Sequence, residues 1–232
     1  MAVKTDFSEQ QWREILSHYQ LGEYKASQPI PPGNVQTNFF LQTTQGAFVL
    51  WNYGIELCRD LAHEAAQEVG TVHAEEKLEW VEQELAKLRL PKSLPKGICH
   101  GDFHFSNILF KDGAFQALLD FDDANYTFLM YDLATLIDPF LPSFDWDTWS
   151  RFQEDENVFD FREARKTVLE YSTYRPLSKN EKSHLFDVYK LTILFDCIWY
   201  FQRGEGHDFY EKRKIDALNR LGREQFYHEL FV

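Results

Sequence analysis

Apolar side chains recur at helical spacing over most of this chain, and the pattern predicts a largely α-helical protein. Near the N-terminus, Trp12, Ile15 and Leu16 share one helical face, and Ser8 with Gln11 forms a predicted capping box at its start. Prolines at positions 91 and 95 end a long periodic stretch in the first half. Helices are therefore predicted over residues 8–19, 55–90, 161–174 and 178–201, with a last short helix after Gly206.

Short strands are predicted between these helices, which makes the expected fold class α+β. Residues 37–42 and 46–53 form one predicted hairpin, and residues 97–99 form a short strand. A second hairpin joins residues 108–110 to residues 117–119 through Lys111-Asp112-Gly113, whose composition is typical of a tight turn.

Polar residues capable of phosphoryl transfer lie at both ends of this second hairpin. Asp102 and Asn107 have the D-x-x-x-x-N spacing of a kinase catalytic loop, and Asp120 follows the second strand. One carboxylate can accept a proton from a substrate hydroxyl, while an amide oxygen and a second carboxylate can ligate Mg²⁺. The alternative is a chance hairpin with acidic ends, because each short motif alone is common.

The order in which these motifs follow one another makes the family resemblance more specific than any single motif does. His100-Gly101-Asp102, Asn107, Asp120-Phe121 and Tyr131-Asp132-Leu133-Ala134 follow one another as in the aminoglycoside phosphotransferase family, which includes choline kinases and type II homoserine kinases. The chain resembles the homoserine-kinase-like members in particular, and the resemblance continues through Arg175-Pro176-Leu177-Ser178. It implies a protein-kinase-like fold with a reduced β N-lobe at residues 1–54 and a largely helical C-lobe at residues 55–232.

The resemblance also implies the roles of individual residues. Asp102 would be the catalytic base, and Asn107 and Asp120 would ligate Mg²⁺, with ATP as co-substrate. Asp132 would hold the backbone of the catalytic loop, a role compatible with that of a carboxylate at a helix N-terminus. The implied reaction moves the γ-phosphoryl group of ATP to a hydroxyl of a small metabolite. A homoserine-like amino alcohol is favoured over a choline-like or aminoglycoside-like acceptor.

The chain departs from the family on its nucleotide side. The strand that should carry a phosphate-binding lysine has Trp51 at that position. The turn before the first hairpin contains only Gly33, which forms either a weak phosphate cradle or, as the preferred interpretation, a plain turn. The chain then enters its helical stretch directly, without residues for a hinge against adenine. No nucleotide-binding residue is therefore assigned. The rival interpretation is a pseudokinase or truncated member that binds a metabolite or protein; an incomplete gene model is a further alternative.

The composition limits which binding partners and which cellular location are expected for the protein. The net charge of −13 and pI near 5.0 argue against nucleic-acid binding. No apolar run of membrane-spanning length and no signal peptide is found, which predicts a cytoplasmic protein without a membrane partner. Three scattered cysteines form no C-x-x-C pair, so neither zinc nor a disulfide framework is indicated. Cys99 beside the loop is expected to be buried rather than reactive.

Three further features have open interpretations. The acidic residues between 145 and 160 either help bind an amine or form a solvated loop, which is the default. His104 contacts phosphate or substrate, or else is packed or faces solvent. Apolar residues of the first hairpin must bury against the helices at 57–88 or against a second copy, and a two-fold homodimer is the favoured hypothesis.

Overall fold

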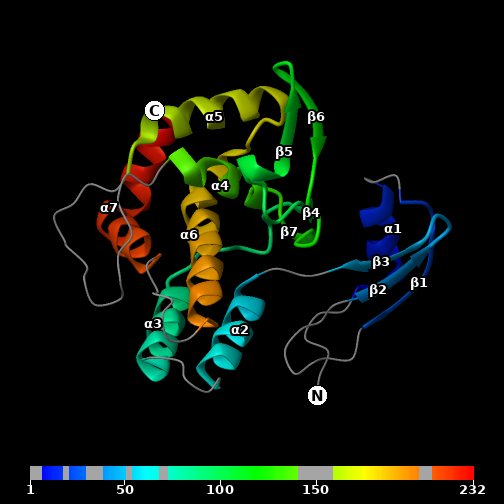
Figure 1. The fold of residues 1–232 in the computed structure, drawn as a ribbon, viewed down its shortest axis with the longest axis horizontal. Coiled ribbons are helices and arrows are strands. Elements are labelled where there is room, and N and C mark those ends of the chain that lie inside the picture. The colour runs from blue at the N-terminus through cyan, green and yellow to red at the C-terminus, as the bar shows by residue number, and fades with distance from the viewer. Residues whose placement is uncertain are drawn as a thin grey trace.

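The computed structural model of the chain describes residues 7–17, 21–29, 39–50, 54–67, 73–140, 159–203 and 211–232, without the side chains of residues 49 and 50. Figure 1 shows a small β-rich unit beside a larger helical body, with the β5–β6 hairpin projecting from that body. The α+β class with a reduced N-terminal unit and a largely helical C-terminal part is confirmed.

The N-terminal unit is a helix packed on a three-stranded antiparallel sheet in the order β1-β2-β3. Trp12 and Phe39 are buried between helix and sheet, with ring centroids 5.2 Å apart. The predicted hairpin is present, but the prediction missed its third strand, because that strand is mostly exposed and polar and has no alternating pattern. The elements are α1 (Glu9–Ser17), β1 (Tyr24–Pro29), β2 (Phe39–Thr43) and β3 (Ala47–Leu50).

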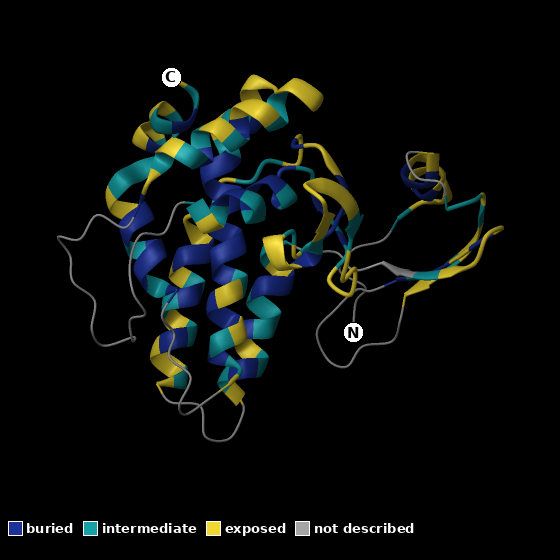
Figure 2. Cartoon of the chain, turned by 45° about the horizontal axis from the view of Figure 1, so that its top comes forward, coloured by how far each residue is buried: buried dark blue, intermediate teal, exposed yellow. Residues whose placement is uncertain are grey.

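The helical body is built around one long buried helix, α6, which Figure 2 shows dark blue along much of its length. Helices α2, α3, α4 and α7 pack against it. Two two-stranded sheets, β4–β7 and β5–β6, carry the loops at one end of this body. Its helices are α2 (Ile55–Gln67), α3 (Ala74–Ala86), α4 (Tyr131–Ile137), α5 (Phe161–Tyr174), α6 (Lys179–Phe201) and α7 (Lys212–Phe231). Its strands are β4 (Lys96–Cys99), β5 (Ile108–Lys111), β6 (Ala114–Leu118) and β7 (Asn125–Phe128), and its short 3₁₀ turns are η1 (Phe105–Asn107) and η2 (Asp138–Phe140).

Two helix predictions are corrected. The stretch predicted over residues 55–90 contains two helices, α2 and α3, and His73 adopts a left-handed conformation (φ 55°) directly before α3. The last helix, predicted to be short, spans Lys212–Phe231, with a break at Gly222 where φ is 77° and ψ is 162°. Gly222 divides the periodic pattern of apolar residues in this segment into two halves, and each half alone predicts only a short helix.

Both predicted capping boxes are present. The Gln11 side chain accepts a hydrogen bond from the Ser8 backbone N–H at 2.9 Å, and the Ser8 hydroxyl accepts one from the Gln11 N–H. Ser178 and Glu181 make the same reciprocal contacts at the start of α6. These bonds satisfy backbone donors that the first turn of a helix leaves free.

The homodimer hypothesis and the domain boundary at residue 54 both remain predictions. One premise of the dimer hypothesis changes: among the described residues of the first hairpin, the buried apolar side chains do not pack against the helices at 57–88. Phe39 and Leu41 instead bury against α1, and this cluster touches the body through Tyr126, whose ring lies 5.5 Å from that of Phe7. Strands β1 and β3 still form the edges of the sheet.

The structure also describes the cysteines and the length and polarity of the helices. Cys58, Cys99 and Cys197 are free and buried, as expected for thiols outside a disulfide framework. Among the residues with described structure, no helix combines the length and the apolar character needed to cross a membrane.

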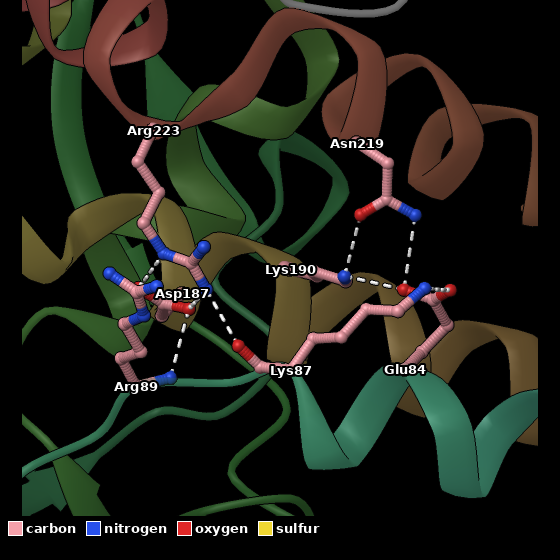
Figure 3. A network of polar contacts seen from close by, with 7 residues as sticks. All are labelled: Glu84, Lys87, Arg89, Asp187, Lys190, Asn219 and Arg223. Atoms are coloured by element: carbon pink, nitrogen blue, oxygen red, sulfur yellow. Dashed lines mark hydrogen bonds and ion pairs between the residues drawn. The ribbon is translucent and has the colours of Figure 1, made fainter.

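Buried ions tie α3, α6 and α7 together at the end of the body shown in Figure 3. The ammonium of Lys190 donates to the Glu84 carboxylate at 2.5 Å and to the Asn219 side-chain oxygen at 2.8 Å. Nearby, Arg223 donates to both oxygens of the fully buried Asp187. Lys190 and Glu84 are 1% and 3% exposed, and removal of Lys190 leaves the buried Glu84 carboxylate with the half-exposed Lys87 ammonium at 2.6 Å and the Asn219 amide at 3.1 Å as its partners.

The Lys190→Met variant is therefore expected to lose about 3 kcal/mol of unfolding free energy, since the buried Glu84 carboxylate loses its buried cation and keeps only Lys87 and Asn219 as partners. The double variant Lys190→Met with Glu84→Leu should be less destabilised than the single one. Urea denaturation followed by circular dichroism measures both. Lys166→Met, which breaks an exposed pair with Glu163, is the matched control and should leave the midpoint unchanged. Equal midpoints for Lys190→Met and Lys166→Met would contradict the role given to the buried pair.

Candidate active site

The loop after β4 is held by one carboxylate from α4. The backbone N–H groups of His100 and Gly101 donate to the two oxygens of Asp132 at 2.8 and 3.0 Å. Burial raises the pKa of Asp132, and these two hydrogen bonds oppose that rise. The predicted contact of Asp132 with the loop backbone is confirmed, and its place in the first turn of α4 agrees with the dipole argument as well.

Asp102 and Asn107 are brought together as the motif predicted. The Asn107 amide donates to the Asp102 carboxylate at 2.8 Å and to the Asp102 carbonyl at 3.0 Å. Asn107 is 9% exposed, whereas Asp102 is exposed to solvent. The buried amide thus fixes the direction of an accessible carboxylate, which is the arrangement that a general base requires.

The amide oxygen of Asn107 remains largely uncommitted. It receives only a 3.5 Å contact from the Ser106 hydroxyl. Asp120 is exposed in the turn after β6, where its backbone adopts a left-handed conformation with φ of 61°. Both side chains offer hard oxygen donors to a divalent cation, so the donor chemistry fits Mg²⁺. Within the described ranges no group of three or more His, Cys, Asp or Glu side chains could hold a metal. A site of one amide and one carboxylate would rely on phosphate oxygens for its remaining ligands.

The turn after β6, which carries Asp120 and Asp123, lies directly against the loop after β4 at Gly101. A Cβ atom on this residue would fall 2.2 Å from the Asp123 carbonyl oxygen, and its φ is +86°. The buried Asn125 side chain donates to that same carbonyl at 2.7 Å. Gly101 permits this close approach and Asn125 fixes it, so together they set the distance between Asp102 and the turn that carries Asp120.

Two other side chains of the loop have structural roles. The His100 imidazole lies between Phe103 and Phe121, and its Nε2 is 2.8 Å from the Leu119 carbonyl oxygen. The His104 ring is exposed and caps η1 by accepting a hydrogen bond from the Ser106 N–H. Both interpretations of His104 remain predictions, since an exposed ring can also reach a phosphate or a substrate. Burial raises the pKa of the Cys99 thiol, in agreement with a structural cysteine.

A cleft with a volume of about 570 Å³ opens beside Asp102. The floor and walls come from the loop, from the end of α6 and from the start of α7. Acidic and aromatic side chains predominate. Its charged lining residues are Asp102, Asp123, Asp138, Asp196, Glu211 and Lys214, and the indole of Trp199 lines it as well.

Sequence reasoning found the loop but missed the far wall of this cleft. No recognised sequence motif contains Asp196, Glu211 or Lys214. The only indication of them in the sequence is a cluster of charged residues in otherwise apolar helices. Asn125 was missed for the same reason. Trp51, Gly33 and the acidic residues from 145 to 158 lie outside the described residues. Asp160, the last of that acidic group, caps α5.

Several known proteins are similar to this chain over part of its length. Residues 50–177 match the model of the phosphotransferase enzyme family, and the chain belongs to this family. The chain is similar to a homoserine kinase of Phenylobacterium zucineum, with 33% identity over 97 residues, or 42% of this chain and 27% of that protein. A homoserine kinase of Gluconacetobacter diazotrophicus is 32% identical over 135 residues, 55% of this chain and 38% of that protein. The matches therefore span well under half of these relatives.

A solved structure offers a more distant likeness. A choline kinase from Cryptosporidium parvum aligns with a TM-score of 0.44 and 15% identity, over 75% of this chain and 56% of that one.

Gly101→Ala is expected to lower both stability and any phosphotransferase activity, because the new methyl group would push the Asp123 carbonyl away from the loop. Gly113→Ala is the matched control: its φ is +77°, but no atom lies within 4 Å of the added carbon. The control should cost only the strain of a left-handed residue, about 1–2 kcal/mol. Thermal melts and turnover assays on both variants separate the effect of backbone strain from the effect of the steric contact with the Asp123 carbonyl. A Gly101→Ala variant no worse than Gly113→Ala would disprove the close approach.

Proposed function

We propose that this protein transfers the γ-phosphoryl group of Mg·ATP to a hydroxyl of a small amino alcohol. The observation that carries the proposal is the accessible Asp102 carboxylate, held by the buried Asn107 amide at 2.8 Å and facing a cleft that can admit an acceptor. Family membership and the homoserine kinase relatives support the same reaction class. The amine is the feature shared by the homoserine-like, choline-like and aminoglycoside-like acceptors that the sequence suggested.

In this proposal the acceptor oxygen attacks the γ-phosphorus, the bond from that phosphorus to the bridging oxygen of ADP breaks, and the hydroxyl proton passes to Asp102. The Asn107 oxygen and Asp120 would hold Mg²⁺, which when bound neutralises phosphate charge. Asp132 acts through the backbone: it holds the loop so that Asp102 and Asn107 keep their relative positions. The wall formed by α6 and α7 would contact the acceptor.

The rival function is that of a catalytically impaired binding module. It is favoured by the short connection between β3, which ends at Leu50, and α2, which begins at Ile55. That connection leaves few residues for an adenine-binding hinge. The cytoplasmic location remains a proposal under either function.

Asp102→Asn should lower turnover of ATP by about 10²- to 10⁴-fold, because the amide cannot accept the acceptor's proton. Asp120→Ala should lower it at least as much through loss of a metal ligand. Asp112→Asn changes an exposed carboxylate at the tip of the β5–β6 hairpin and serves as control. Release of ADP with a panel of amino alcohols measures all three. Near wild-type turnover in either of the first two variants would refute the assignment of that residue.

Nucleotide affinity should depend on the phosphates rather than on the base. ATP, GTP and inorganic triphosphate are expected to bind weakly, with similar affinity and only with Mg²⁺, because no hinge backbone is assigned to the adenine. Isothermal calorimetry with and without Mg²⁺ measures this dependence. Strong preference for ATP over GTP would instead indicate that another segment rebuilds the base pocket.

A further inference from the structure

Another cavity lies in the region shown in Figure 3, where α3, α6 and α7 meet. It has a volume of about 350 Å³ and opens between the end of α3, the first half of α6 and the break in α7. It shares no described lining residue with the cleft beside Asp102. Four of its lining side chains are cationic and none of the described ones is acidic. The cationic residues are Lys87, Arg89, Lys190 and Arg223.

Two carboxylates bind to these four cations. Glu84 accepts hydrogen bonds from Lys87 at 2.6 Å and from Lys190 at 2.5 Å. The Asp187 carboxylate accepts two from the Arg223 guanidinium, at 2.8 and 2.5 Å. Four lining cations against the two carboxylates bonded to them leave an excess of two positive charges, in a protein whose net charge is −13. A concave site with an excess of one sign of charge concentrates ligands of the opposite sign.

The cations of this cavity repel one another. Burial lowers the pKa of Lys190, Glu84 opposes this change, and the charges of Lys87 and Arg223 lower the pKa further. The pKa therefore stays below its ordinary value although the ammonium is bonded to a carboxylate. An anion in the cavity would reduce this repulsion, and the reduction favours its binding.

Three of the cationic side chains have N–H groups left for a ligand. The Arg89 side chain is exposed, and its guanidinium makes no hydrogen bond or ion pair with the described residues. The Arg89 backbone N–H donates to Asp187 at 3.0 Å, which anchors this residue beside the cavity. Arg223 uses its Nε and Nη2 groups, whereas its Nη1 has no hydrogen-bond partner in the described part of the chain. The half-exposed Lys87 ammonium has three N–H groups and donates one of them to Glu84.

The Arg223 guanidinium is held in a fixed orientation. Its Cζ lies 5.0 Å from the centroid of the buried Phe186 ring, and its Nη2 also donates to the Lys87 carbonyl at 2.7 Å. Because these contacts exist without a ligand, the free Nη1 group needs little further ordering when an anion binds.

We propose that this cavity binds a small phosphorylated metabolite, with the phosphate group held by Arg89, Arg223 and Lys87. The proposal is independent of the proposed phosphotransferase function. A phosphate monoester carries a charge of about −1.5 to −2 at neutral pH, which matches the excess of two positive charges. Its tetrahedral oxygens can accept hydrogen bonds from side chains of separate segments, whereas one guanidinium satisfies both oxygens of a planar carboxylate.

Calorimetry on the full chain tests the proposal, with glycerol 3-phosphate as the probe and EDTA present so that no metal supports phosphate binding elsewhere. One molecule should bind per chain, and neutral glycerol should not bind. Arg89→Gln should weaken binding about tenfold, because charge-assisted hydrogen bonds are lost while the backbone contact with Asp187 remains. Arg89→Glu should abolish binding. Arg162→Gln removes an exposed arginine outside the cavity and, as the matched control, should keep the wild-type affinity.

The melting temperatures of the Arg89 variants should equal that of the wild type, because the Arg89 side chain has no described partner to lose. Wild-type affinity in Arg89→Gln, or no binding of glycerol 3-phosphate at about 10 mM, would overturn the proposal. Sedimentation with phosphatidic acid vesicles distinguishes a lipid headgroup from a metabolite. Vesicle binding that depends on Arg89, without binding of the soluble ester, would overturn the assignment to a metabolite.

Discussion

The candidate site depends on the two hydrogen bonds that His100 and Gly101 donate to Asp132. They join the end of β4 to the first turn of α4, and α4 is itself packed on α6. The loop would otherwise be an exposed turn with little apolar contact to hold it. These two hydrogen bonds connect the loop through α4 to the buried helix α6. The accessible Asp102 carboxylate therefore has a defined direction although it lies at the surface.

The sequence predicted the loop well because its geometry is local. Asp102 and Asn107 lie five positions apart, and the hydrogen bonds between them close within a single turn of chain. The β5–β6 turn was equally predictable, since Asp112 and Gly113 supply the positive φ values of 51° and 77° that a tight hairpin requires. Such features depend on neighbouring residues alone.

The features that were missed depend on residues far apart in the chain. β7 is a strand because it pairs with β4, and β1 because it pairs with β2. The break at Gly222 comes from a single residue with positive φ inside a periodic stretch, and His73, also with positive φ, directly precedes α3. Lys214 belongs to the cleft only because α7 returns to pack on α6. Spacing within one segment carries no information about these contacts.

Helix α6 has two roles along its length. Asp187 and Lys190 anchor it to α3 and α7 through buried ions, and nine residues after Asp187 the same helix places Asp196 in the cleft, roughly 14 Å away along its axis. The two charged regions differ in what balances them. Every charge of the buried network has a partner in the fold, so this region contributes stability. Asp196 makes no such contact with the described residues, so substitutions there should cost less stability than substitutions in the network.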